Sequence, residues 1–259
     1  MVRVPLLIIK VSNILAFFFL FADNLYASIG SERIDSPYLQ AHLTYISPAV
    51  FTFHIWILIQ IMLGCFAEEH IRTIGWNFVG IVALNCLWLN CWQEDLITLS
   101  WIAILLMVLQ LSYIYYQLEF TYLPYTIEDD QIDVILDVAL IHLPFSLYHS
   151  WSVVLLAITT FTIFMPEKIA ENPSLIELVV VIGVLISFEL LAIMYISANN
   201  DFAGFAGYVV ILFTLIGISY EQEEIVIHLS AILLSLISAT YFVISLIMKL
   251  TAPPSKKQD

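Results

Sequence analysis

Few ionisable side chains lie within the long apolar stretches of this chain, and three of them are its first candidates for chemistry. His54 and His149 occur in two separate stretches, and Glu189 lies near the middle of another, in Ile-Ser-Phe-Glu-Leu-Leu. Ionisable groups are costly inside a membrane and mark ligand, ion or proton pathways there. We expect Glu189 to be either a proton-linked acid or a neutral acid that hydrogen-bonds a neighbouring helix. The two histidines either hydrogen-bond other helices or ligate a haem or metal, but no third ligand stands near them, so the sequence predicts no metal site.

Tryptophan and amide side chains form a second set of candidates. Trp56, Trp88 and Trp151 lie within the apolar stretches beside polar residues, whereas many other aromatic residues lie near the ends, as in interfacial belts. Flat apolar ligands bind in aromatic-lined cavities, so these three tryptophans indicate either a ligand pocket or plain helix packing. Asn85 is expected to hydrogen-bond a neighbouring membrane helix.

The reactive residues do not predict an enzyme. The apolar stretches hold no paired carboxylates, and the chain shows no Ser-His-Asp set, no HExxH motif and no phosphate-binding loop. The three cysteines include no CxxC pair, which argues against a zinc site and against a disulfide framework.

The elements that must position these residues are membrane-spanning helices. The chain is 61% apolar and 12% charged, with a mean hydropathy of +0.96, whereas soluble domains average about 45–50% apolar and 25% charged residues. A helix crosses the hydrocarbon core with about 20 mostly apolar residues. Such stretches occur at 5–27, 46–67, 74–92, 97–118, 141–164, 175–197, 202–220 and 225–250. We therefore expect an all-α, polytopic membrane helix bundle with about eight transmembrane helices.

Charge indicates the partners and the orientation. The net charge of −14 argues against nucleic acid as a partner and leaves the lipid bilayer as the principal environment. Basic residues favour the cytoplasmic side, and an even number of spans puts both termini on one side. With the N-terminus inside, that side carries Arg3, Lys10, Arg72, Lys249, Lys256 and Lys257, and the other carries Arg33 and Lys168. A multi-pass protein with both termini cytoplasmic is the prediction.

Three motifs, in register on three predicted helices, resemble the TspO/MBR family. The second span has a proline followed eight residues later by a tryptophan, Pro48 and Trp56. The third has Leu-Asn-x-x-Trp ending at Trp88, and the fifth has Pro144-Phe145 with Trp151 nearby. The family includes the translocator protein, also called the peripheral benzodiazepine receptor, and the bacterial tryptophan-rich sensory proteins. The form of the motifs resembles its longer-chain branch.

The resemblance implies a five-helix core over residues 1–165, additional transmembrane helices over 166–250 and a cytoplasmic tail over 251–259. It implies a pocket that opens toward one membrane face, with the loop 28–45 as its lid, and porphyrin or haem as a ligand. Dimers are common in the family, which implies a homodimer. The residues expected at the ligand, including Tyr148 where the family has a tryptophan, are His54, Trp56, Asn85, Trp88, Pro144, Tyr148, His149 and Trp151.

Three functions are compatible with these features. The first is binding of a small hydrophobic or amphipathic ligand, tetrapyrrole-like or lipid-like, for sensing or movement across the bilayer. The second is a proton-linked carrier or channel that uses Glu189. The third is a structural or assembly subunit that packs against other membrane proteins through residues 175–250.

Overall fold

The computed structural model describes residues 6–29, 42–64, 74–121, 138–165, 173–198 and 203–251, and these residues are helical apart from the segment 42–49 and short turns. The elements, in chain order, are α1 (Leu6–Ile29), the 3₁₀ turn η1 (Val50–His54), α2 (Ile55–Gly64), α4 (Trp76–Gln93), α5 (Ile97–Thr121), the π-helical turn η3 (Val138–His142), α7 (Leu143–Phe164), α8 (Leu175–Ala198), α9 (Ala203–Glu221) and α10 (Ile225–Thr251). The predicted cytoplasmic tail beyond residue 251 lies outside the described residues.

The prediction of a polytopic helical membrane protein is confirmed. Within the described ranges, α1, α5, α7, α8, α9 and α10 are long and apolar enough to cross a bilayer. The second and third predicted spans differ in kind from these six. The second is a 3₁₀ turn followed by the ten-residue α2, and α4 has 18 residues that include three asparagines and a glutamine, which lower its hydropathy.

Local sequence explains where several helices begin. Pro144 lies in the first turn of α7, where the missing N–H has no partner to lose. Before α8, the Ser174 N–H donates to Glu177 Oε2 over 2.6 Å and the Glu177 N–H donates to Ser174 Oγ over 3.3 Å, which is a capping box. Glu224 Oε2 accepts hydrogen bonds from two N–H groups at the start of α10.

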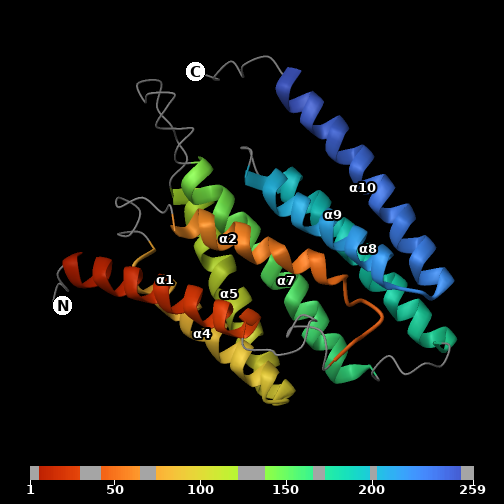
Figure 1. Cartoon of the computed structure of the whole chain (residues 1–259). Helices are drawn as coiled ribbons and strands as arrows, with labels where there is room; N and C mark the ends of the chain where they lie inside the picture. The colour runs from red at the N-terminus through yellow and green to blue at the C-terminus, as the bar shows by residue number, and fades with distance from the viewer. Residues whose placement is uncertain are drawn as a thin grey trace.

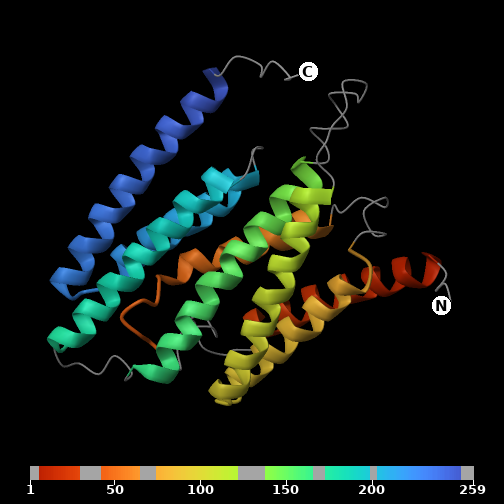
Figure 2. The same cartoon turned by 180° about the vertical axis from the view of Figure 1, so that it is seen from behind.

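The helices form one bundle in which α9 is central. From one side to the other, α1 packs on α4, α4 on α5, α5 on α7 and α7 on α9, while α8 and α10 both pack on α9 and on each other (Figure 1). Seen from behind, α1 and α10 again lie at opposite sides of the molecule (Figure 2). A single hydrophobic core includes buried residues from every one of these helices except η3. The predicted segments 1–165 and 166–250 therefore share one core.

The contact between α7 and α9 depends on small residues and serine hydroxyls. Ser146 Oγ donates to the Ala203 carbonyl over 2.7 Å, and Ser150 Oγ donates to the Gly207 carbonyl over 2.8 Å. All residues from Ala203 to Tyr208 are buried. The small residues at the start of α9 therefore allow α7 to approach closely.

The segment 42–49 holds η1 against the C-terminal end of α9. The Ala49 N–H donates to the Gly217 carbonyl over 3.0 Å, and Gln222 Nε2 donates to the Ser47 carbonyl over 2.9 Å. Residues 44–49 are all buried. Of the predicted lid at 28–45, residues 30–41 lie outside the described chain, and the described end of that loop is packed into the bundle.

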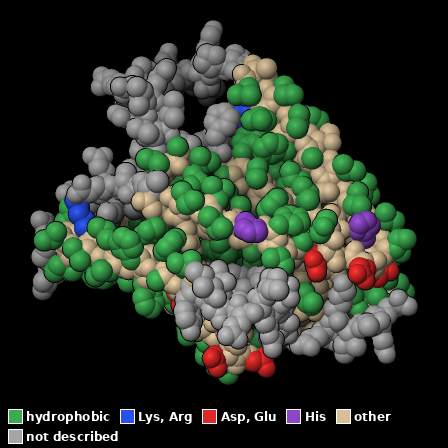
Figure 3. Space-filling model, viewed as in Figure 1, with side chains coloured by type: hydrophobic (Ala, Val, Ile, Leu, Met, Phe, Trp, Pro, Cys, Tyr) green, Lys and Arg blue, Asp and Glu red, His purple; other side chains and the backbone are tan. Residues whose placement is uncertain are grey.

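The outer surface is apolar along the helices. Figure 3 shows hydrophobic side chains over most of the visible face, with acidic side chains gathered toward one rim. On α10, the exposed residues include Leu229, Leu233, Leu236, Ile244 and Met248. This distribution suits contact with lipid tails.

Candidate functional site

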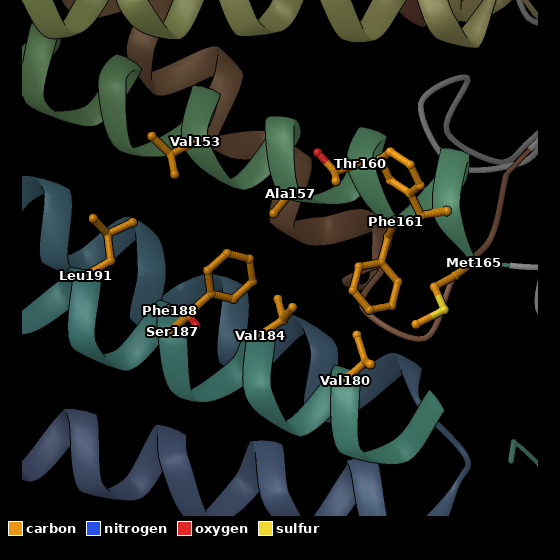
Figure 4. Close-up of a pocket in the computed structure, with 11 residues that line it drawn as sticks. Val153, Ala157, Thr160, Phe161, Met165, Val180, Val184, Ser187, Phe188 and Leu191 are labelled. Carbon is orange, nitrogen blue, oxygen red and sulfur yellow. The ribbon is translucent and has the colours of Figure 1, made fainter. Parts of the chain in front are cut away.

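An apolar groove of about 420 Å³ lies between α7 and α8. Ligand pockets typically measure about 300–1,000 Å³, so its size suits a small molecule. We call it the α7–α8 groove, and Figure 4 shows side chains from both helices pointing toward one another across it. The residues that line it are Val153, Ala157, Thr160, Phe161, Phe164, Met165, Val180, Val184, Ser187, Phe188 and Leu191.

The groove lies between two helices that pack on α9 rather than on each other. Both helices pack closely against α9, and within the described residues they do not pack closely against each other. Near the start of α7 and the end of α8, His149 Nδ1 lies 2.6 Å from the Tyr195 hydroxyl. Beyond this bridge the groove extends from Val153 and Leu191 to Met165 and Val180 (Figure 4).

The polar groups that line the groove are already hydrogen-bonded. Thr160 Oγ1 donates to the Leu156 carbonyl over 2.6 Å and accepts the indole N–H of Trp101 over 3.0 Å. Ser187 Oγ donates to the Gly183 carbonyl over 2.8 Å. The remaining lining side chains are apolar. An occupant therefore meets hydrocarbon, an aromatic ring or a thioether, and little that would compensate a buried polar or charged group.

Trp56, Trp88, Tyr148 and Trp151 lie together in the bundle core rather than at the groove. Their side chains are at most 4% exposed. The rings of Trp56 and Tyr148 are 5.4 Å apart and edge-on, and Trp151 meets Phe53 in the same way at 5.2 Å. We call this group the core aromatic cluster. Edge-to-face contacts at these distances are typical of packed aromatic pairs.

In the core aromatic cluster, Trp56 Nε1 and Trp151 Nε1 are buried with no hydrogen-bond partner among the described residues. Buried polar groups are usually paired, so these two donors are available to a hydrogen-bond acceptor that enters the cluster.

Asn85 and Pro144, also predicted at the ligand, are buried as well. Asn24 Nδ2 donates to Asn85 Oδ1 over 3.4 Å, and Asn85 Nδ2 lies 3.8 Å from the Met107 sulfur. Asn85 thus connects α4 to α1 and α5, as expected of an amide between membrane helices. Pro144 is buried in the first turn of α7.

The structure separates the two predicted histidines. His54 is exposed, and its Nδ1 lies 2.8 Å from the Phe51 carbonyl. His149 bridges three helices, because its Nε2 lies 2.8 Å from Ser112 Oγ on α5 and its Nδ1 meets Tyr195 on α8. Tyr115 stacks on its ring at 5.4 Å. Within the described ranges, no three His, Cys, Asp or Glu residues are placed to hold a metal ion.

Glu189 faces away from the groove. It lies on α8 beside Tyr208 of α9, and its side chain is 6% exposed. Its neighbours in sequence, Ser187 and Phe188, line the groove.

Sequence reasoning did not identify the residues of the groove. They recur at helical spacing along α7 and α8, which is also the pattern of any buried helix face. An apolar helix face that packs on another helix has the same residue types as one that lines a groove. The sequence therefore offered no signal for the groove.

Comparison with known proteins assigns the family. A family model described as TSPO-like protein matches residues 10–247. No curated protein and no solved structure gives a significant match. The matched region extends well past residue 165 and includes α8, α9 and most of α10, so the resemblance is not confined to the first five spans. Together with the apolar helices, the match indicates an integral membrane protein that binds small ligands. The chain belongs to the TSPO-like protein family.

Proposed function

We propose that this protein binds a small lipid-like molecule in the α7–α8 groove, for sensing or for movement across the bilayer. The observation that carries the proposal is the groove itself, about 420 Å³ in volume and lined almost wholly by apolar side chains. Burial of apolar surface favours occupancy by a hydrocarbon chain or a flat apolar ring system.

The lining favours a lipid-like ligand over a tetrapyrrole. A porphyrin carries carboxylates, which bind well when they meet cationic or N–H donors. Among the described residues, the lining of the groove includes no lysine, arginine or histidine, and its two hydroxyl groups already donate to helix carbonyls. A fatty chain needs no such donors.

The position of the groove supports entry from the membrane. It is partly open to the outside of the bundle, and Phe164 on its lining is 73% exposed. Both helices beside it are apolar enough to span a bilayer. A lipid-like molecule can therefore move between the bilayer and the groove without crossing water.

The test uses Trp101 as an internal reporter, because its indole donates to Thr160 in the groove lining. A brominated long-chain alcohol, which carries no charged group, is titrated into the protein in nanodiscs, since bromine quenches tryptophan fluorescence on contact. We expect a saturable loss of Trp101 emission, measured as the difference between the wild type and Trp101→Phe.

Two filling variants and one matched control make the test specific. Ala157→Phe and Val184→Phe place a ring in the groove, and we expect each to abolish the saturable component. Leu190→Phe enlarges an exposed side chain of α8 outside the groove lining and should leave quenching unchanged. Quenching that rises linearly with probe, or that survives both filling variants, would show that the probe only partitions into lipid.

A further inference from the structure

Glu189 is a buried carboxyl at the place where three helices meet. It belongs to α8, and its Oε1 lies 3.5 Å from the hydroxyl of Tyr208 on α9. The same hydroxyl donates to the Ser238 carbonyl of α10 over 2.9 Å and accepts from Ser238 Oγ over 2.9 Å. Tyr208 and Ser238 are fully buried.

The carboxyl has no counter-ion among the described residues. Its Oε2 is buried without any hydrogen-bond partner there. The titratable groups that face this site are Tyr208 itself and Tyr241 of α10, whose ring stacks on Tyr208 at 6.0 Å. The basic groups of α10 lie elsewhere, because His228 Nδ1 contacts the Ser219 carbonyl and Lys249 lies over the Phe205 ring.

An ionised carboxylate does not suit this arrangement. A carboxylate has two charged oxygens, and leaving one of them without a donor in an apolar interior is costly. A protonated carboxyl has only one carbonyl oxygen to leave unpaired, which costs much less because that oxygen carries no net charge. Binding a proton neutralises the Glu189 carboxylate without requiring a cavity for a larger ligand.

The hydrogen bonds around Tyr208 form a consistent set when that proton is present. Glu189 Oε1–H then donates to the Tyr208 oxygen, Ser238 Oγ–H donates to the same oxygen, and the Tyr208 O–H donates to the Ser238 carbonyl. The phenol is both a donor and an acceptor, and in this arrangement its oxygen accepts from Glu189 and Ser238 while its O–H donates. When the proton leaves, the Tyr208 O–H is free to turn from the Ser238 carbonyl to the carboxylate.

We infer that Glu189 is a reversible proton-binding site whose state changes the hydrogen bonding between α8, α9 and α10. Loss of the proton replaces the contact between Tyr208 and the Ser238 carbonyl with one between Tyr208 and Glu189. The proton leaves as a hydrated proton, and no other bond is made or broken. This site does not require the α7–α8 groove, whose lining does not include Glu189.

Infrared difference spectroscopy tests the site directly. A protonated carboxyl in an apolar environment has a C=O stretching band at higher frequency than carboxyls in water. Spectra of the full-length protein in nanodiscs are recorded from acid to alkaline pH. We expect one such band to disappear reversibly as the pH rises, and to be absent at every pH in Glu189→Gln. The matched control is Glu223→Gln, which changes an exposed acid in the turn before α10 and should keep the band.

A second variant keeps the inference testable if Glu189→Gln fails to fold. Tyr208→Phe preserves the ring that stacks on Tyr241 and removes only the hydroxyl. Because that hydroxyl contacts the carboxyl, we expect the band to change frequency in this variant. A wild-type spectrum with no pH-dependent buried carboxyl band would overturn the inference, and so would a band unchanged by Glu189→Gln or by Tyr208→Phe.

Discussion

Gly207 controls the bridge that closes one end of the α7–α8 groove. A Cβ added at Gly207 would lie 2.6 Å from Cδ1 and 2.8 Å from Cε1 of the Tyr195 ring. Non-bonded carbon atoms in proteins do not approach this closely. The ring of Tyr195 must therefore move in Gly207→Ala. Its hydroxyl, which lies 2.6 Å from His149 Nδ1, then leaves the histidine.

The expected cost follows from three contributions. Overpacking of a well-packed core costs about 1–3 kcal/mol. Loss of a hydrogen bond between membrane helices costs about 0.6–1.7 kcal/mol. Replacing a helical glycine with alanine stabilises the helix by about 1 kcal/mol, because alanine has the higher helix propensity. We expect Gly207→Ala to lower the free energy of unfolding by about 1–4 kcal/mol.

The assay is reversible unfolding in mixed micelles with increasing denaturing detergent, followed by helix content. Gly183→Ala is the matched control, because a Cβ there meets nothing within 4 Å and the variant should be as stable as the wild type or more stable. In a Tyr195→Phe background, Gly207→Ala should cost less, since the hydrogen bond is already gone. Equal stability of the Gly207 and Gly183 variants would refute this reasoning about the bridge.

Three further predictions concern the segment 42–49, η1 and their packing against α9. In Gly217→Ala the new Cβ would overlap Thr52 Oγ1, and we expect a loss of about 1–3 kcal/mol in the same unfolding assay. Gln222→Ala removes a buried hydrogen bond to the Ser47 carbonyl and should speed proteolytic cleavage at 42–49, whereas an unchanged rate would mean that this bond does not hold the segment. Burial, followed by the nearby carboxylates, raises the pKa of Tyr45 above its usual value of 10.0. The contribution of neutral Tyr45 to the free energy of unfolding is present below pH 10.0 and is lost as the pH rises through the raised pKa. In Tyr45→Phe, the free energy of unfolding should therefore fall less steeply at alkaline pH, with unfolding monitored by tyrosinate absorbance.

Helix positions were predictable because each depends on a local run of residues. The apolar stretches at 97–118 and 175–197 became α5 and α8 with nearly the same limits. Pro144 lies in the first turn of α7, which is a local effect of the proline. The described part of the stretch at 46–67 begins with the 3₁₀ turn η1 rather than with an α-helix, and just before η1 the Ala49 N–H donates to the Gly217 carbonyl of α9. Hydropathy alone contains no information about that distant contact.

The residue types of the predicted aromatic side chains were enough to predict that they are buried. They were not enough to predict which residues they contact. Trp56 and Trp151 are large apolar side chains in apolar helices, so burial is expected wherever those helices pack. Their contacts with Tyr148 and Phe53 depend on how η1 and α2 pack against α7. His54, by contrast, lies on the exposed side of η1, because its side chain turns back to the Phe51 carbonyl.

By itself, the sequence determined that this chain is a helical membrane protein of the TSPO-like kind, since apolar length and three short motifs are local properties. Only the tertiary structure decided which space is left between the helices and which polar groups find partners. The α7–α8 groove exists because both helices pack on α9 and are bridged at one end through His149 and Tyr195. Glu189 is isolated because α9 and α10 present a tyrosine and a serine to it rather than a base. Cavities and unpaired polar groups arise where two packed helix surfaces fail to match, so they depend on which surfaces come into contact in the folded protein.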